Sequence, residues 1–237
     1  MSVFTYHLAK TNPISALKVL LSPPKARNTP GLMHAECMTA MTLGSAIFST
    51  SRILMGQVVL FAQWENEAAI DQFLKSTHIG SIFAKGWHTR LMLTRQWGKI
   101  TEFGISNENM EADISDTAAV VVVTLARMRF LEIPRFIHWG RPVEKLVRDH
   151  PDTALSLASI RFPRTVSTFS IWRSQEQMQD MVYGKSNIHD PKRHVNAMRE
   201  RDRKDFHVEF TTLRFKPISE FGEWNGRTNI IPNLHNQ

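Results

Sequence analysis

The sequence has few of the features that usually assign a chain to a class of protein. Its 237 residues include one cysteine, Cys37, so no disulfide can form within the chain. Such scarcity is typical of a reducing compartment. No apolar run is long enough to span a bilayer. The first ten residues, MSVFTYHLAK, lack a basic region followed by an apolar stretch, so we expect no secretory signal and a cytoplasmic location.

Chemical motifs are also scarce. We find no phosphate-binding glycine loop, no nucleophile elbow and no clustered spacing of metal ligands. The segment HAEC at 34–37 contains the His-x-Glu of zinc deaminases, but those enzymes also need Pro-Cys-x-x-Cys, which one cysteine cannot supply. Cys37 could in principle bind a haem iron as a thiolate, but its apolar strand favours a small buried core residue.

The composition allows a substantial core and favours anionic partners. Apolar residues make up 42% of the chain, the formal net charge is +7 and the pI is about 9.8. A basic balance suits nucleic acid, anionic lipid, or a cofactor that carries carboxylates or phosphates. Charge alone does not choose among these three.

Two long segments of the chain repeat the same pattern. Residues 58–78 read VVLFAQWENEAAIDQFLKSTH, and residues 166–189 read VSTFSIWRSQEQMQDMVYGKSNIH, with Trp64 matching Trp172. Each segment ends in a Lys-Ser pair followed by a histidine. Further on, ITEFG at 100–104 returns as ISEFG at 218–222. An internal repeat of this length indicates a duplicated structural unit.

Each copy predicts the strand and helix order β-α-β-β-α-β, which is the ferredoxin-like unit. The first copy is predicted from strands 3–9, 33–41, 56–64 and 89–97 and helices 14–21, 65–74 and 79–85; the second is predicted from strands 118–127, 153–161, 165–172 and 207–215 and helices 133–139 and 174–183. We expect an N-terminal half at 1–104, an acidic linker at 105–116, a C-terminal half at 117–226 and a tail at 227–237.

A ferredoxin-like sheet carries helices on one face only, so its bare face must be buried against something. Two tandem copies can bury these faces against each other. The predicted fold class is therefore α+β, with two tandem ferredoxin-like (βαββαβ) units that form a dimeric α+β barrel-type fold. A pocket inside that barrel is the expected place for a ligand.

The two repeated histidines, His78 and His189, precede segments of different character. His78 precedes an apolar helix, whereas His189 precedes the strongly basic DPKRHVNAMRERDRK. A loop histidine before an arginine-rich helix could ligate iron while cations neutralise carboxylate arms. From the residues alone, an exposed helix-capping role is the better interpretation of His189. His194 lies five residues on and could serve instead.

Several arginines could bind the carboxylates of a cofactor or substrate, because a guanidinium matches a carboxylate geometrically. Arg199 lies in the mixed charge run 198–206, which otherwise indicates a solvated helix face. The other candidates lie at strand ends or turns: Arg127, Arg129, Arg161 and Arg164.

An ordered set of short segments resembles the spheroidene monooxygenase family, the carotenoid ketolases of purple bacteria. These segments are QWG at 96–98, VVTLARMRF at 122–130, FSIW at 169–172 and FGEWNG at 221–226. The resemblance covers roughly residues 58–226. It implies a haem-dependent monooxygenase of the dimeric α+β barrel group, which also includes chlorite dismutases, dye-decolourising peroxidases and aldoxime dehydratases.

The resemblance also implies a cofactor and its ligand. The family has a Gly-Pro-His segment ahead of its last helix, and the matching segment here is SNIHDPKRH at 186–194. This correspondence makes His189 the expected iron ligand of a haem b in the C-terminal half, with His194 as the second choice. Arg199, Arg127 and Arg129 are the expected partners of the haem propionates.

The resulting prediction is a monooxygenase that oxidises an apolar small molecule with O₂, using electrons from a redox protein. The first alternative is another haem enzyme on this scaffold, similar to aldoxime dehydratase or a peroxidase. A further alternative is a non-enzymatic protein that binds RNA or a ligand, although the sheet segments lack the aromatic signature of RNA-recognition domains, so no nucleic acid is expected. Peripheral membrane contact and self-association stay open.

Overall fold

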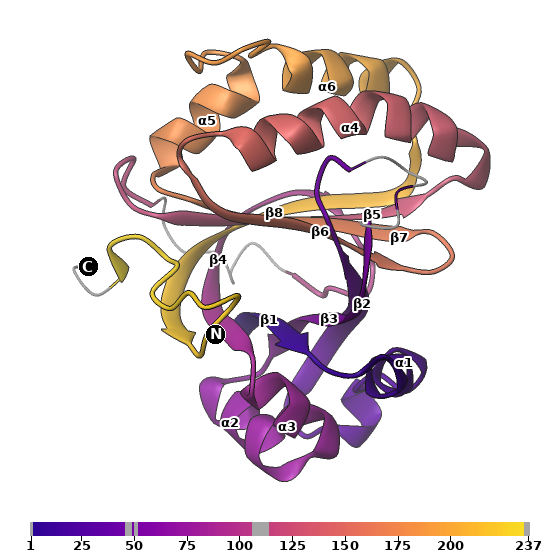
Figure 1. The fold of residues 1–237 in the computed structure, drawn as a ribbon, viewed down its shortest axis with the longest axis vertical. Helices are drawn as coiled ribbons and strands as arrows, with labels where there is room; N and C mark the ends of the chain where they lie inside the picture. The colour runs from indigo at the N-terminus through magenta and orange to yellow at the C-terminus, as the bar shows by residue number, and fades with distance from the viewer. Residues whose placement is uncertain (1, 46–48, 50–51, 106–113, 235–237) are drawn as a thin grey trace.

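Two ferredoxin-like halves close into one barrel (Figure 1). The computed structural model describes residues 2–45, 49, 52–105 and 114–234, and within them eight antiparallel strands follow the order β1-β3-β2-β6-β7-β5-β8-β4. The pairs β2–β6 and β4–β8 join the two halves. The predicted fold class is confirmed. Most of the predicted linker, residues 106–113, lies outside the described residues.

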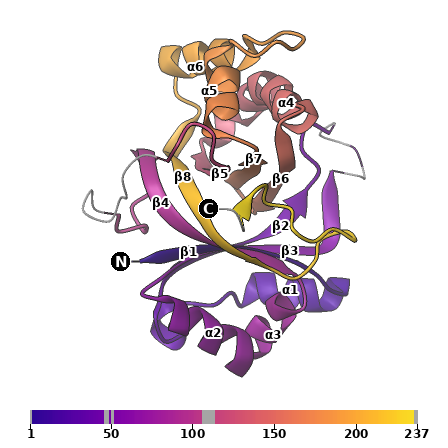
Figure 2. The ribbon, with the colours of Figure 1, turned by 90° about the vertical axis from the view of Figure 1, so that its left-hand side faces the viewer.

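The two halves contain corresponding elements. The N-terminal half consists of β1 (Val3–Lys10), α1 (Pro13–Leu21), β2 (Leu32–Met41), β3 (Ile53–Trp64), α2 (Glu67–Ser76), α3 (His78–Ala84) and β4 (Trp87–Lys99). The C-terminal half consists of β5 (Val120–Met128), α4 (Ile133–Asp149), β6 (Thr153–Arg161), β7 (Thr165–Trp172), α5 (Gln175–Tyr183), α6 (Arg193–Arg203) and β8 (His207–Phe221). Short 3₁₀ turns precede β2 and α4, at Ala26–Asn28 and Phe130–Glu132. Figure 2 shows the helices of each half on opposite sides of the barrel.

Local sequence fixes where the helices begin. The side chain of Asn12 accepts a hydrogen bond from the Ser15 backbone N–H at 2.8 Å, and Pro13 follows in the first turn of α1. Asn66 and Ser174 cap α2 and α5 in the same way. Such caps satisfy backbone donors that the first turn of a helix leaves free, which is why these three boundaries were close to the predicted ones.

The prediction for α4 was wrong in length. The sequence predicted a helix over 133–139, and a proline such as Pro142 normally disrupts a helix. The observed α4 continues to Asp149 with Pro142 inside it. Its second half is held by packing, since Leu146 is buried and Val147 contacts two apolar clusters of the C-terminal half.

The described residues fill the barrel interior as a packed core, where the sequence predicted a ligand pocket. Side chains from both sheets meet there with their exposed fractions near zero, among them Phe4, Phe61 and Phe215. The rings of Tyr6 and Phe169 stack across the interior with centroids 3.8 Å apart. Each sheet therefore uses the other to bury its helix-free face.

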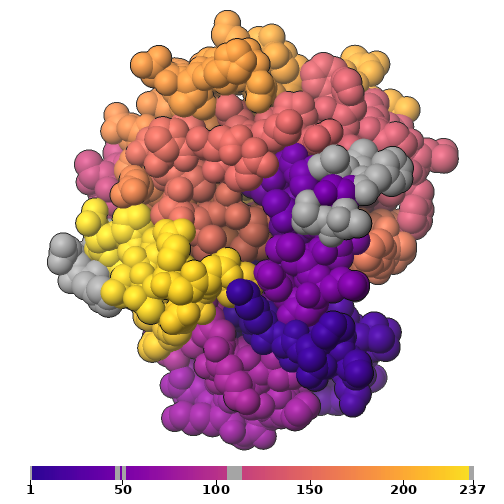
Figure 3. Space-filling model, viewed as in Figure 1, coloured from indigo at the N-terminus to yellow at the C-terminus, as the bar shows by residue number. Residues whose placement is uncertain are grey.

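A C-terminal segment covers one end of the barrel. Figure 3 shows it in yellow, against both the N-terminal and the C-terminal halves. Its Ile230 and Ile231 belong to the barrel core, and their backbone N–H groups donate to the Glu220 carboxylate at 2.7 and 2.9 Å. The Trp87 indole donates to the same carboxylate at 2.6 Å. Among the residues described, no helix is long and apolar enough to cross a membrane.

We predict that Glu220→Ala lowers the free energy of unfolding by about 2 kcal/mol or more, because three buried donors lose their acceptor. Chemical denaturation followed by tryptophan fluorescence measures this change. Glu223→Ala is the matched control, since Glu223 is exposed and accepts one hydrogen bond, from the Gly226 backbone. Equal midpoints for the two variants would show that Glu220 does not fasten the segment.

Candidate functional site

The outer face of the C-terminal sheet is less well covered by its helices than the outer face of the N-terminal sheet. In the N-terminal half, the outward side chains of β1 and β3, such as Ala9, Leu60 and Ala62, are fully buried under α1 to α3. The corresponding face of β5 and β7 carries half-buried side chains: Val122, Thr124, Val166 and Thr168. Of the two described outer faces, the C-terminal one therefore offers a partly open surface between sheet and helices.

Side-chain volume explains this difference. In the N-terminal half His7 pairs with Leu60 on one side and with His88 on the other. The equivalent position of β5 is Thr124, which pairs with Thr168 and Thr212. Three large side chains in one half thus correspond to three threonines in the other.

We call Thr168, Thr124 and Thr212 the threonine row. All three are half-buried, and the hydroxyl groups of Thr124 and Thr212 lie 3.3 Å apart. The row crosses three adjacent strands on the face that α4, α5 and α6 cover (Figures 1 and 2). It presents methyl groups and hydroxyl groups but no charge, which suits an apolar ligand that needs a few hydrogen bonds.

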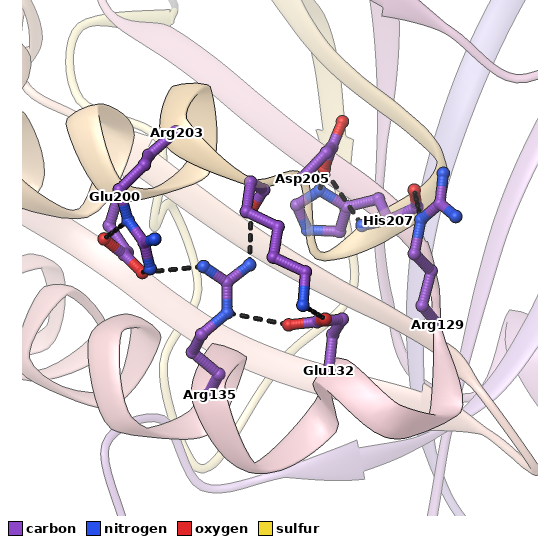
Figure 4. A network of polar contacts seen from close by, with 8 residues as sticks. Arg129, Glu132, Arg135, Glu200, Arg203, Asp205 and His207 are labelled. Carbon is purple, nitrogen blue, oxygen red and sulfur yellow. Dashed lines mark hydrogen bonds and ion pairs between the residues drawn. The ribbon is translucent and has the colours of Figure 1, made fainter.

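A network of charged side chains fixes α6 against α4 (Figure 4). Arg135 donates to Glu132 at 2.7 Å and to Glu200 at 2.6 Å. Arg203 binds Glu200 and Lys204 binds Glu132. Hydrogen bonds from Arg203 and Arg135 lower the pKa of Glu200 to about 2. Because the network joins the start of α4 to the end of α6, it determines where the inward side chains of α6 lie.

One stripe of α6 faces the rest of the C-terminal half. His194, Ala197 and Arg201 lie three and four positions apart, so they share a helix face. Ala197 is buried, and the Arg201 guanidinium lies over the Phe210 ring of β8, 4.0 Å from its centroid. His194 therefore lies on the side of α6 that faces the other helices, and its ring contacts the end of α5.

His194 has the hydrogen bonding of a metal-binding histidine. Its Nδ1 lies 3.0 Å from the Val182 carbonyl oxygen at the end of α5. A carbonyl acceptor requires a proton on Nδ1, which leaves Nε2 as a lone-pair donor. Burial lowers the pKa of His194, so the ring is neutral near pH 7. Nε2 makes no hydrogen bond to any of the described residues.

His189, the expected ligand, lies in a different environment. Its side chain is 89% exposed in the turn before α6, and its Nε2 lies 3.3 Å from an Asp190 carboxylate oxygen. This arrangement fits the exposed role that the residues alone suggested. The assignment of His189 as iron ligand stays a prediction, and the geometry favours His194.

The structure separates the predicted arginines. Arg127 lies at one end of the barrel, where it contacts the carboxylates of Glu36, Glu102 and Glu209. It is fully engaged there and faces the barrel rather than the helices. Arg129 donates to the His207 carbonyl oxygen at 2.8 Å. Arg199 is exposed on α6 and, within the described part of the chain, makes no hydrogen bond or ion pair.

Sequence reasoning missed the buried carboxylate at that barrel end. The side chain of Glu36 is 2% exposed. Its carboxylate oxygens lie 2.8 Å from a nitrogen of Arg161, 3.2 Å from Nε2 of His34 and 3.4 Å from a nitrogen of Arg127. Arg161, one of the candidates for binding a cofactor or substrate carboxylate, pairs with Glu36 in the structure. The alternation of His34, Glu36 and Met38 along β2 was the available signal, since alternate residues of a strand share a face.

A stacked histidine pair in the N-terminal half was also missed. The rings of His7 and His88 lie 4.8 Å apart and nearly parallel, under α3. Burial lowers the pKa of His7 well below its ordinary value and that of His88 to about 4, with a further contribution from neighbouring positive charge. Neither nitrogen of His7 finds a hydrogen-bond partner among the residues described. Both rings are therefore held neutral, as packing groups.

The remaining metal candidates are weak. In the described ranges no three His, Cys, Asp or Glu side chains are grouped to hold a metal ion. Cys37 is buried, and burial raises the pKa of its thiol to about 12, so it is not a thiolate near neutral pH. The interpretation of Cys37 as a core residue is confirmed.

The fold is that of ferredoxin-like α+β barrel proteins, as similar solved structures show. No protein-family model and no curated protein matches the sequence. A crystal structure of aldoxime dehydratase is similar at 9% identity with a TM-score of 0.55, covering 91% of this chain and 81% of that one. The aldoxime dehydratase OxdRE, solved with butyraldoxime, gives 10% identity and a TM-score of 0.52, covering 91% of this chain and 79% of that one. At these identities the likeness establishes the fold alone.

The histidine pair predicts how stability depends on pH. An unfolded histidine takes up a proton below about pH 6.5, whereas the folded chain keeps His7 neutral, so stability is complete above that pH and falls as the pH drops. For each such histidine, the free energy of unfolding falls by roughly 1.4 kcal/mol per pH unit below about pH 6. We predict that His7→Leu makes the free energy of unfolding less dependent on pH, by the contribution of one histidine.

Urea denaturation at pH 5, 6 and 7 measures this dependence as a slope against pH. His78→Leu is the control, because His78 is exposed at the start of α3 and its substitution should leave the slope unchanged. A His7→Leu slope equal to that of the unmodified chain would contradict the prediction.

Proposed function

We propose that the chain is a haem-dependent oxidoreductase whose haem is held in the C-terminal half by His194. The observation that supports this most is the neutral imidazole with Nδ1 on a backbone carbonyl and Nε2 free for a metal. The resemblance to spheroidene monooxygenases implies a histidine ligand just ahead of the last helix, where His189 corresponds best and His194 is the second choice. His189, the first expectation, is the alternative ligand.

The surroundings of His194 fit a large, flat, anionic group. The threonine row supplies an uncharged surface opposite the helices. Between α4 and the start of α6 lies a groove of about 550 Å³, whose lining includes the cations Arg141, Lys145 and Arg193. The groove is open to solvent, and its guanidinium and ammonium groups suit the propionates of haem. We therefore assign the propionates to this groove, whose lining contains Arg193 of α6 but not Arg199.

A bound haem would supply iron for chemistry on oxygen or on a nitrogen–oxygen bond. The residues of this chain would do the rest. His194 would fix the iron, and its hydrogen bond to Val182 would orient the ring. The hydroxyl groups of the threonine row would orient the substrate, and the apolar groups around them would exclude water. An apolar small molecule, O₂ and an electron-donating redox protein are the partners that this function requires.

A second reaction, aldoxime dehydration, is the alternative, because the fold is also that of aldoxime dehydratases. Dehydration of an aldoxime consumes neither O₂ nor external electrons, so the two reactions differ in their requirements. The same haem site serves both. We do not propose RNA binding, because each sheet has one face in the barrel core and the other toward helices, which leaves no open sheet for bases to stack on among the described strands.

We predict that the purified protein binds one haem per chain and that His194→Ala abolishes this binding. The ultraviolet–visible spectrum after reconstitution with haem measures it through the Soret band. His189→Ala should keep the band, since that side chain is exposed. Added imidazole should restore a band to His194→Ala, which a merely unfolded variant would not show.

The reverse pattern would make His189 the ligand and leave the haem proposal standing. If His189→Ala, His194→Ala and the variant with both substitutions all kept a normal Soret band, neither histidine would be the iron ligand. An unmodified chain that binds no haem would overturn the proposed function.

The threonine row offers an independent test. We predict that Thr168→Leu, which introduces the side chain found at the equivalent Leu60, prevents haem binding by filling the layer between sheet and helices. The fold should survive, because the N-terminal half accommodates this leucine. Thr168→Val is the matched control, since it changes the hydroxyl but not the volume. Haem titration measures both variants, and equal affinities would place the haem elsewhere.

A further inference from the structure

Helix α1 exposes an apolar stripe to the outside of the protein. Ile14, Leu17 and Leu21 are 70%, 56% and 74% exposed. Their spacing of three and four places them on one helix face. The opposite face, with Ala16 and Val19, is buried against the N-terminal sheet. The helix is thus anchored to the barrel by one face and presents large aliphatic groups with the other.

The segment around this stripe is cationic and has no acidic residue. The first carboxylate of the chain is Glu36, and before it come Lys10, Lys18, Lys25 and Arg27. Within the described part of the chain, these four cations form no ion pair with a carboxylate. Elsewhere the protein pairs many of its arginines, as in the network between α4 and α6. Lys10 lies over the Trp224 ring, and the charges of Lys18, Lys25 and Arg27 beside the α1 stripe are available to a partner.

We propose that α1 docks on the surface of a membrane that contains anionic phospholipids. Aliphatic groups at 14, 17 and 21 enter the boundary between headgroups and acyl chains, and the flanking lysines and arginine bind lipid phosphates. An apolar stripe with cations and no carboxylates has the composition of an interfacial helix. The proposal is independent of the haem, since α1 belongs to the other half.

Two other occupants fit the stripe less well. A second copy of this chain, docked through the same face, would bring like charges together, which opposes self-association. An acidic protein would satisfy the charge, but protein contact surfaces are usually enriched in aromatic residues and arginine, whereas this stripe is aliphatic and its cations are mostly lysine. The aliphatic and lysine composition favours lipid.

The test is flotation of the full chain with vesicles of phosphatidylcholine alone or with about one-third phosphatidylglycerol. We expect at least tenfold stronger binding to the anionic vesicles, reduced by high salt. Leu17→Ser together with Leu21→Ser should reduce binding at least tenfold, and Lys18→Glu should weaken it at low salt. Circular dichroism and thermal melting confirm that these exposed substitutions leave the fold intact.

Leu131→Ser is the matched control, because Leu131 is 94% exposed outside α1. It should bind vesicles like the unmodified chain. The proposal would be overturned if Leu131→Ser lost as much vesicle binding as the double variant. It would also be overturned if the unmodified chain bound neutral and anionic vesicles equally, or bound neither. The proposal would also be overturned if light scattering showed that the unmodified chain is a dimer that does not bind vesicles, and that the double variant is a monomer. A double variant that loses only an acidic redox protein would assign α1 to a protein partner instead.

Discussion

Each four-stranded sheet of this protein has helices on one face, and its other face is too apolar to be left in water. This constraint determines the whole architecture, because the tandem copy supplies the missing cover. Rings such as Phe4, Phe61 and Phe215 meet in the barrel, and the pairs β2–β6 and β4–β8 close its seams. Closure also removes the free sheet edges that would otherwise invite association.

In the described residues the inner faces form a packed core, and the less covered surface lies on the outer face of the C-terminal sheet. The two halves have diverged there through the size of a few side chains. His7, Leu60 and His88 fill one half, and the threonine row leaves the other partly open. The two halves thus differ in how completely their outer faces are covered. The proposed ligand His194 lies in the less covered half.

The fold could be predicted from the sequence because the internal repeat and the spacing of apolar residues both depend on local structure. Pro13 marked the start of α1 in the sequence, whereas α4 was predicted too short because tertiary packing extends it beyond Pro142. The sequence did not allow us to predict which side chains contact one another. Nothing in the sequence says that Arg161 meets Glu36 across the β2–β6 seam, or that Val182 lies beside His194. Such pairings depend on where distant elements meet.

The seam between β4 and β8 has a consequence for synthesis of the chain. The first four strands are complete at Lys99, but the strand that closes them begins only at His207. At about 5–20 residues per second, the ribosome needs roughly ten seconds to make the missing half. During that interval the nascent N-terminal sheet exposes its aromatic face and two open edges. The duplication that stabilises the finished barrel thus leaves the N-terminal half without its cover until the second half has been made.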